Sequence, residues 1–199
     1  MNSWSKIARR IRVPLGFVLA AAYLWRAQPA WTSLAAGCVF IAAGLALRAW
    51  ASGHLRKNTE LTTTGPYAYV RNPLYMGSVI LAAGFALAAR DEWLWAAMCA
   101  FFVAFYFPVI LAEEAWLRAN FSEYGDYARR VPRLLPPWGR AAGEDYARRV
   151  PRLWPRFDGA GAAPSSFSRE LYLQHREYNA LLGAVAMLAV LVVKLLRFS

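Results

Sequence analysis

The sequence predicts an all-α fold, a polytopic membrane helix bundle of about five transmembrane helices with a cofactor site on its cytoplasmic side. The chain has 199 residues, of which 58% are hydrophobic, a larger share than in an average soluble domain. These hydrophobic residues are gathered into runs close to the ~20 residues that cross a bilayer core. The formal net charge of +11 is concentrated in the segments that connect the runs.

Four runs are strong candidates for membrane spans, and a fifth is weaker. The strong candidates cover residues 31–52, 73–89, 93–112 and 178–196. The weaker one covers 11–27, where Arg12 and Arg26 would have to extend their charged ends to the two interfaces. A secretory signal is disfavoured for this segment, because Trp25 and Arg26 stand where a cleavage site would lie. An in-plane amphipathic helix is the alternative to a span.

The distribution of basic residues predicts the orientation. They gather before the first span, in the 53–72 loop and in the 114–177 segment, whereas Arg26 and the near-neutral 90–92 turn lie in the opposite connections. By the positive-inside rule, the N-terminus and the two basic segments are cytoplasmic and the C-terminus is outside. The Ala- and Arg-rich composition indicates a bacterial inner membrane. Basic residues beside spans predict anionic membrane lipids as partners, and no nucleic acid.

A polar stretch at residues 65–77 separates the second and third spans. Within it, Asn72 is a favoured N-cap and Pro73 a favoured first helical residue. Free N–H groups and the positive end of the helix dipole are therefore expected to face the cytoplasmic interface, where they can bind an anion. Arg71 adds a charge that can bind a carboxylate or phosphate in two places. The start of the third span is thus predicted to be a positive site.

Two adjacent carboxylates, Glu113 and Glu114, lie at the end of the fourth predicted span. With a rise of ~1.5 Å per residue, the third span and the returning fourth span bring them to the depth of Pro73. Pro108 is expected to bend the fourth helix just before this end. A positive helix end that faces a negative pair suits a zwitterionic ligand.

These features also have purely structural interpretations. Asn-Pro commonly precedes a helix, and Arg71 could serve only to set the orientation in the membrane. The two glutamates could pair with Arg118 or Arg129. The convergence of all of them on one place favours a binding site. No metal site is predicted, since His54 and His175 are isolated and Cys38 and Cys99 fall inside apolar spans.

Five motifs follow one another within residues 61–135, namely Gly65-Pro66-Tyr67, Arg71 to Gly77, Glu113 to Leu117, Phe121 to Tyr127 and Arg130 to Arg133. In this order they resemble the isoprenylcysteine carboxyl methyltransferase and phospholipid methyltransferase superfamily. The resemblance implies an integral-membrane methyltransferase that uses S-adenosylmethionine. It implies a lipophilic methyl acceptor, either a small molecule or a lipid-modified substrate, resembling an isoprenylcysteine carboxylate or a lipid headgroup.

The resemblance also implies the roles of individual residues. The implied catalytic residues are Arg71, Asn72, Tyr75, Glu113 and Glu114. The implied cofactor-binding residues are Tyr67, Arg71, Asn72, Pro73, Tyr75, Glu113, Glu114, Tyr124, Tyr127 and Arg130. One position departs from the pattern, because Asn72 stands where histidine is usual in the isoprenylcysteine enzymes. An amide cannot act as a general base, so the acceptor is left open.

The segment after the fourth span contains a direct repeat, since residues 126–134 recur without change as residues 145–153. The first copy keeps the spacing from Glu113 that the resemblance requires, so the site role is assigned to it. The second copy is expected to belong to an interfacial extension that touches lipid headgroups or solvent.

The sequence thus predicts three parts, which are helices one to four in 1–115, a cytoplasmic interfacial segment in 116–177 and a C-terminal span in 178–199. In the last span, Gly183 permits close helix contact, within the bundle or between two protomers. Two other functions are alternatives to a methyltransferase. One is a sterol-reductase-like enzyme that uses NADPH, although such proteins are longer, and the other is a non-catalytic membrane scaffold or lipid-binding protein.

Overall fold

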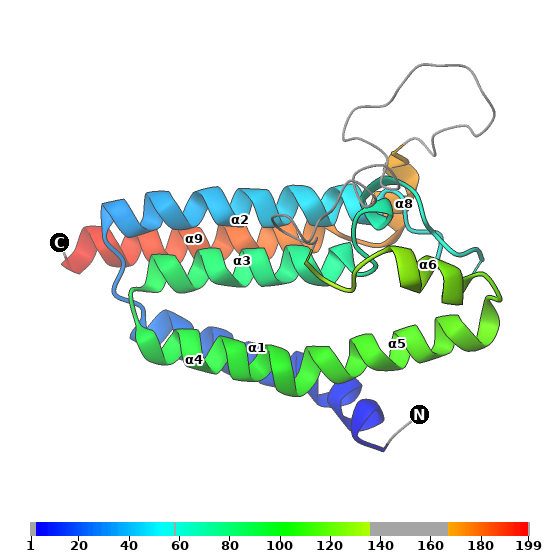
Figure 1. The fold of residues 1–199 in the computed structure, drawn as a ribbon. Helices are drawn as coiled ribbons and strands as arrows, with labels where there is room; N and C mark the ends of the chain where they lie inside the picture. Colours follow the sequence, from blue (N-terminus) through cyan, green and yellow to red (C-terminus); the bar gives the residue numbers. More distant parts are fainter. Residues whose placement is uncertain (1–2, 58, 136–166, 199) are drawn as a thin grey trace, which may run out of the picture.

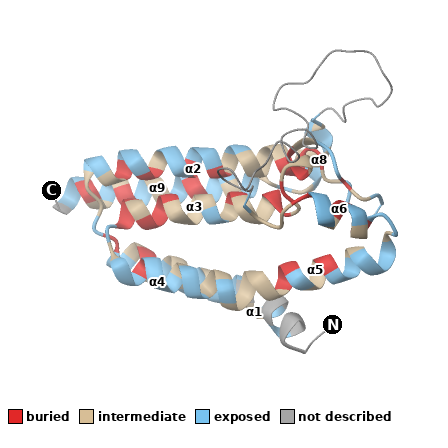
Figure 2. Cartoon of the chain, in the orientation of Figure 1, coloured by how far each residue is buried: buried red, intermediate tan, exposed pale blue. Residues whose placement is uncertain are grey.

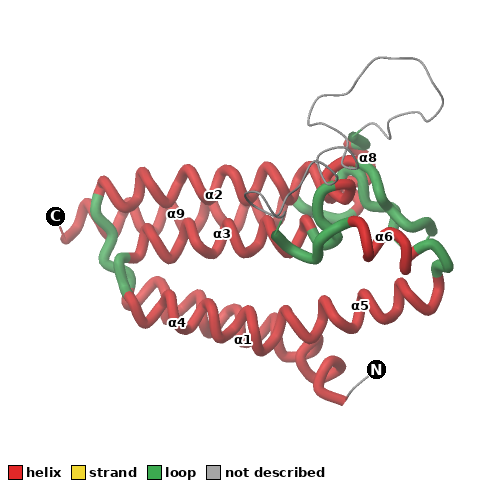
Figure 3. Tube along the Cα trace, in the orientation of Figure 1, coloured by secondary structure: helices red, strands yellow, loops and turns green. Residues whose placement is uncertain are grey.

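The computed structural model describes residues 3–57, 59–135 and 167–198, and all regular elements in these ranges are helices (Figures 1 and 3). The long elements are α1 (Ser3–Arg26), α2 (Trp31–Ser52), α3 (Pro73–Ala89), α4 (Glu92–Phe101), α5 (Phe107–Asn120) and α9 (Tyr178–Phe198). The short ones are the 3-10 turn η1 (Gly65–Ala68), the π turn η2 (Phe102–Tyr106), α6 (Tyr124–Arg130) and α8 (Arg169–Gln174). The predicted all-α class is confirmed. The second copy of the repeat lies outside the described residues.

Among the described residues, three helices are long and apolar enough to cross a membrane, namely Trp31–Ser52, Glu92–Asn120 and Tyr178–Arg197. Val13–Arg26 and Pro73–Ala89 are apolar but shorter. Large apolar side chains such as Val18, Val103 and Leu182 are exposed on the outer faces of the bundle, as expected for contact with lipid. The chain is therefore an integral membrane protein, and the count of five spans stays a prediction.

The elements α4, η2 and α5 form one continuous helix that carries the two glutamates (Figure 1). Pro108 has no N–H, and a proline ring clashes with the carbonyl four residues earlier, so a regular α-helix is disfavoured here. The π turn precedes this proline, and Phe107 N donates to Phe102 O, five residues back. The helix then continues to Asn120, beyond the predicted end of the span at residue 112.

Helices α2 and α3 form a hairpin in which the two backbones touch. A Cβ atom on Gly44 would lie 2.7 Å from Gly77 O, and one on Gly84 would lie 2.7 Å from Gly37 O. Four glycines thus form two facing pairs at which no side chain fits between the helices. This contact fixes the direction in which α3 presents its first turn.

The main core lies between α2, α3, α9, the end of α1 and the start of α4 (Figure 2). Its largest buried side chains include Tyr23, Ile41, Phe85 and Leu191. Tyr23 also donates a 2.8 Å hydrogen bond to Phe85 O, so its hydroxyl is satisfied inside the apolar region. The core holds α1 and α9 against the hairpin.

The bundle has two distinct ends (Figure 1). The site end contains the 53–72 loop, α6, α8 and the start of α1. The far end contains the α1–α2 connection, the α3–α4 turn and the C-terminus of α9. This alternation agrees with the predicted topology, and the assignment of the site end to the cytoplasm stays a prediction.

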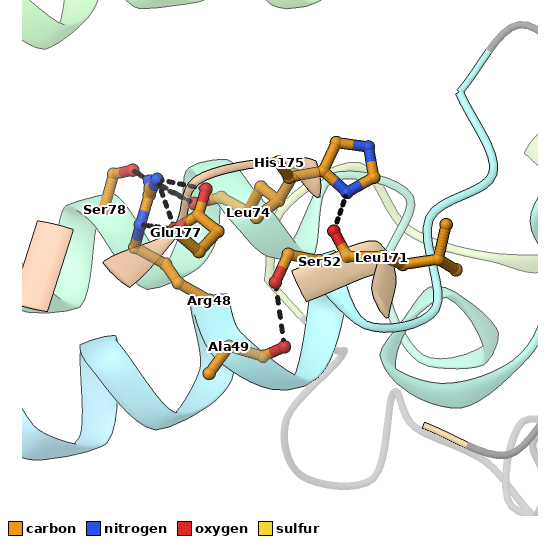
Figure 4. A network of polar contacts seen from close by, with 8 residues as sticks. All are labelled: Arg48, Ala49, Ser52, Leu74, Ser78, Leu171, His175 and Glu177. Carbon is orange, nitrogen blue, oxygen red and sulfur yellow. Dashed lines mark hydrogen bonds and ion pairs between the residues drawn. The ribbon is translucent and has the colours of Figure 1, made fainter. Parts of the chain in front are cut away.

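Charged side chains connect both ends of α9 to neighbouring helices. At the site end, Glu177 accepts hydrogen bonds from Arg48 Nη2 at 2.8 Å and from Arg48 Nε at 3.1 Å (Figure 4). Arg48 also donates to Ser78 Oγ and to Leu74 O, and so joins α2, α3 and α9. At the far end, Lys194 Nζ donates to Trp25 O at 2.8 Å.

We expect Arg48→Ala to destabilise the protein, because it leaves Glu177 with no partner in a largely buried place. The expected loss in the free energy of unfolding is about 3 kcal/mol, the lower end of the range for breaking a buried ion pair. Arg129→Gln is the matched control, since Arg129 and Asp126 are both exposed and such pairs contribute about 0–1 kcal/mol. Thermal unfolding in detergent measures both, and equal midpoints would contradict the assignment.

Candidate active site

A cavity of about 420 Å³ lies at the site end, between the start of α3 and the inner face of α5. Its volume is within the usual range for small-molecule sites. It brings together seven of the predicted site residues, which are Tyr67, Arg71, Asn72, Pro73, Tyr75, Glu113 and Tyr127. It is also lined by Lys57, Leu61 and Trp116 from the neighbouring segments. The structure thus places the two predicted walls around one space.

The start of α3 is the positive wall of this cavity. Pro73 is the first helical residue, as predicted. Asn72 occupies the N-cap position, but its side chain makes no capping hydrogen bond. Its amide nitrogen instead donates to Glu114 Oε1 and to Arg133 O, both at 3.1 Å. A hydrogen bond to a carboxylate is stronger than a neutral capping hydrogen bond from a backbone N–H, so the amide is oriented toward Glu114. The helix end is therefore left without a side-chain cap.

Glu114 is the centre of a buried polar cluster. Its Oε1 accepts from Asn72 Nδ2 and from Arg133 Nε at 2.9 Å, and its Oε2 accepts from Arg133 Nη2 at 2.9 Å and from Arg71 Nη1 at 3.3 Å. The Glu114 side chain is only 7% exposed. The hydrogen bond from Arg133 to this carboxylate raises the pKa of Arg133 above its usual value. Glu114 therefore joins three segments and has its acceptor positions filled.

Glu113 has different surroundings from its neighbour. Successive side chains of an α-helix are rotated by about 100° about its axis. Glu113 therefore lines the cavity, whereas Glu114 does not. No hydrogen bond or ion pair to the Glu113 carboxylate is found within the described part of the chain. Of the two acids, Glu113 is the one available to a ligand.

Arg71 retains donor capacity beside the cavity. Its Nη1 is shared between Glu114 Oε2 and Tyr124 OH, each at 3.3 Å. Its Nε is buried and has no hydrogen-bond partner among the residues that the structure describes. A buried guanidinium N–H without a partner is costly, so this position fits an anionic ligand group.

The first copy of the repeat closes the cavity. Tyr127 is buried and donates a 2.7 Å hydrogen bond to Tyr67 O. Burial raises the pKa of Tyr127 and of Tyr67, so both phenols stay neutral. The following segment is held by the backbone, because Arg71 N donates to Pro132 O at 2.8 Å and Asn72 N donates to Arg133 O at 3.2 Å.

Three predicted cofactor-binding residues do not line this cavity, namely Glu114, which is described above, Tyr124 and Arg130. Tyr124 is buried behind its wall, where its hydroxyl accepts from Arg71. Arg130 is exposed, donates to Asp126 O at 3.3 Å and lines a separate hollow on the surface. Arg133, which was not predicted as a site residue, contacts Glu114 instead. The motif Arg130 to Arg133 contains both arginines, and only the fold distinguishes them.

A second cavity of about 500 Å³ adjoins the first, and Leu74 and Tyr75 line both. Phe17 of α1, Phe101 of α4 and Tyr106 of the π turn contribute aromatic walls to it. The rings of Tyr75 and Tyr106 meet edge to face, with centroids 5.9 Å apart. That α1 contributes to the site could not be predicted from the sequence, since its apolar run has no motif.

A family model described as phospholipid methyltransferase matches residues 31–124. The nickel-cobalt-cadmium resistance protein NccN of Alcaligenes xylosoxydans xylosoxydans is 34% identical over 132 residues, which are 63% of this chain and 62% of that protein. The cobalt-zinc-cadmium resistance protein CzcN of Cupriavidus metallidurans is 30% identical over 132 residues, 63% of this chain and 61% of that protein. The match spans about three fifths of the length of these relatives. No solved structure matches the chain.

The matched range contains α2, α3 and the helix that carries both glutamates, and it ends inside α6. It includes both walls of the 420 Å³ cavity and ends before Arg133. Residues 31–124 thus match the phospholipid methyltransferase family, which lies within the isoprenylcysteine carboxyl methyltransferase-like superfamily, and the resemblance predicted from the sequence is confirmed.

Proposed function

We propose that this chain is an integral-membrane methyltransferase that uses S-adenosylmethionine to methylate a lipophilic acceptor. One observation carries the proposal: Glu113 lines a cavity opposite Arg71 and the uncapped start of α3. The cavity therefore offers a positive wall and a negative wall to a single ligand. The match of residues 31–124 to a methyltransferase family supports methyl transfer as the reaction.

The residues of the cavity fit the charged groups of S-adenosylmethionine. Arg71 and the positive end of α3 would hold its carboxylate, and Glu113 would hold its ammonium. The aromatic side chains of Tyr67, Tyr75 and Trp116 would face its sulfonium or adenine. When bound, the cofactor supplies an activated methyl group with a good leaving group. Glu114 is a positioning residue in this proposal, because it holds Arg71 and Asn72 in place.

The adjoining 500 Å³ cavity fits the lipophilic part of the acceptor. Its aromatic lining is suited to an acyl or prenyl chain, and Tyr75 lies at its boundary with the cofactor cavity. Asn72 has its amide donors engaged by Glu114 and Arg133 and carries no basic atom. The site therefore favours an acceptor that is already nucleophilic, and the protein contributes positioning and exclusion of water.

Calorimetric titration of the purified chain in detergent tests cofactor binding. Glu113→Gln is expected to weaken the affinity for S-adenosylmethionine about 10- to 100-fold, since a hydrogen bond to a charged group contributes roughly 1.5–3 kcal/mol. The thermal midpoint should stay unchanged. Glu123→Gln is the matched control, because Glu123 is an exposed glutamate of the site end that does not line the cavity.

Other outcomes would support the alternatives. Unchanged affinity in Glu113→Gln would overturn the assignment of the negative wall. Binding of NADPH in place of S-adenosylmethionine would favour a reductase, and binding of neither would favour a non-catalytic scaffold. Incubation with cofactor labelled in its methyl group, followed by mass spectrometry of the lipid extract, tests transfer itself.

The names of the two relatives favour a second candidate function, a contribution to tolerance of divalent transition metals. Growth of a deletion strain in cobalt, nickel, zinc and cadmium tests it. If methyl transfer underlies tolerance, complementation should succeed with the wild-type chain and fail with Glu113→Gln. Complementation by both would separate tolerance from the proposed reaction.

A further inference from the structure

A cavity of about 580 Å³ lies at the far end of the bundle, remote from the active site. The end of α1 contributes Trp25 and Arg26, the α3–α4 turn contributes Arg90 and Asp91, and α9 contributes Lys194. None of these residues belongs to the methyltransferase motifs. The cavity therefore requires an explanation of its own.

The cavity has more positive than negative charge. Arg26 binds Asp91 Oδ2 through Nη2 at 2.7 Å and through Nε at 3.1 Å. The other oxygen of Asp91 accepts from Leu94 N at 2.9 Å and caps α4. The hydrogen bond from Arg26 lowers the pKa of Asp91, so this carboxylate stays ionised. Asp91 offsets one cation, and the charges of Arg90 and Lys194 remain.

The cations also retain hydrogen-bond donors. A guanidinium has five N–H donors, and Arg26 engages those of Nε and Nη2 with Asp91 while its side chain stays 43% exposed. Arg90 is exposed, and no hydrogen bond of its side chain is found in the part of the chain that the structure describes. Lys194 donates to the carbonyls of Leu24 and Trp25. The guanidinium of Arg90 and the remaining N–H groups of Arg26 are thus available to an anion.

Exposed tryptophans indicate the depth of this cavity in the membrane. Trp25, Trp31 and Trp93 are 82%, 57% and 74% exposed, and they stand at the far ends of α1, α2 and α4. Tryptophan is enriched at the membrane–water interface, at the level of the lipid headgroups. The cationic cavity therefore lies where phospholipid phosphates are found.

We propose that this cavity binds the headgroup of an anionic phospholipid, in the leaflet opposite the active site. Arg26 and Arg90 would contact the phosphate, and Lys194 would add to the attraction. The alternative is that the cations only complement the carbonyl ends of α1 and α3. Arg90 has a left-handed backbone conformation, with φ of 53°, which glycine adopts more easily at the end of a helix. The end of α3 alone therefore does not explain why an arginine stands at this position. The lipid would also join α9 to the rest of the bundle at this end.

The test measures binding of phosphatidylglycerol and of phosphatidylcholine to the delipidated full chain by native mass spectrometry. The wild type should bind phosphatidylglycerol more tightly. Arg90→Gln should weaken that binding about fivefold, the effect expected for one basic residue near an anionic surface, and should leave phosphatidylcholine unaffected. Arg90→Lys should retain most of the preference, and the control Arg129→Gln, an exposed arginine of the site end, should retain all of it.

Arg90→Gly separates lipid binding from folding. It removes the left-handed strain, so it should raise the thermal midpoint in lipid-free detergent, while the affinity for phosphatidylglycerol falls about as far as in Arg90→Gln. The proposal is overturned if Arg90→Gln or Arg90→Gly binds phosphatidylglycerol as the wild type does. It is also overturned if inorganic phosphate raises the midpoint as much as the lipid does. Affinity for S-adenosylmethionine, measured on the same samples, reports on the active site independently.

Discussion

Glu114→Ala is expected to destabilise the protein by about 3–5 kcal/mol, the usual cost of removing one partner from a buried charged network. The substitution leaves the guanidinium of Arg71, which is 12% exposed, without its carboxylate. It also removes one of the two acceptors of Asn72 and both carboxylate oxygens that accept from Arg133. The segment after α6 would then lose the link that the Glu114 carboxylate makes between Arg133 and Arg71. Thermal or chemical unfolding in detergent measures the loss.

Glu113→Gln is the matched control, since it changes the neighbouring residue of the same helix and leaves the cluster around Glu114 intact. It should lower cofactor affinity without lowering stability, whereas Glu114→Ala should lower both. A Glu114→Ala protein that unfolds at the wild-type midpoint but no longer binds S-adenosylmethionine would show that Glu114 is a direct ligand, as the sequence predicted.

Gly44→Val is expected to have the second large effect. Even a single Cβ atom at this position would lie 2.7 Å from Gly77 O and 2.7 Å from Leu81 N, both of which are backbone atoms. Overpacking of a close helix contact costs about 1–3 kcal/mol or more, and here the helices must separate because no flexible side chain can yield. Displacement of α3 should also weaken cofactor binding, because its first turn forms the positive wall.

Gly183→Ala is the control for this substitution. Apart from its own helix backbone and chain neighbours, no atom of the described residues lies within 4 Å of a Cβ placed on Gly183. Alanine therefore fits at this position and should improve helix stability by about 0.5–1 kcal/mol. Unfolding midpoints of the two variants give the comparison. A Gly44→Val protein as stable as the wild type would show that α2 and α3 are not in backbone contact.

The sequence predicted the elements whose signals are local. The start of α3 at Pro73 and the turn between α3 and α4 follow from residues at those positions, and both are observed. The meeting of the two walls followed from the rise of a helix over a known length. The family resemblance came from ordered motifs and needed no tertiary information.

The contacts that define the site could not be predicted in the same way. Arg48 and Glu177 are 129 residues apart, and neither lies in a recognisable motif. The glycines of α2 and α3 form a seam only because two particular faces meet. Which arginine of the motif Arg130 to Arg133 reaches Glu114 depends on where α6 ends. These are properties of packing between distant segments, and periodicity along the chain does not record them.

Because of the π turn between α4 and α5, the geometry of the site depends on the helical register of the residues that follow this turn. A π turn holds one residue more than an α-helical turn, so it is equivalent to a one-residue insertion. If α4 stays in place, loss of a single codon there would rotate the rest of the helix by about 100°. Glu114 would take the place of Glu113, and Ala115 would take the place of Glu114. The cavity would keep an acid, and Arg71, Asn72 and Arg133 would face a methyl group.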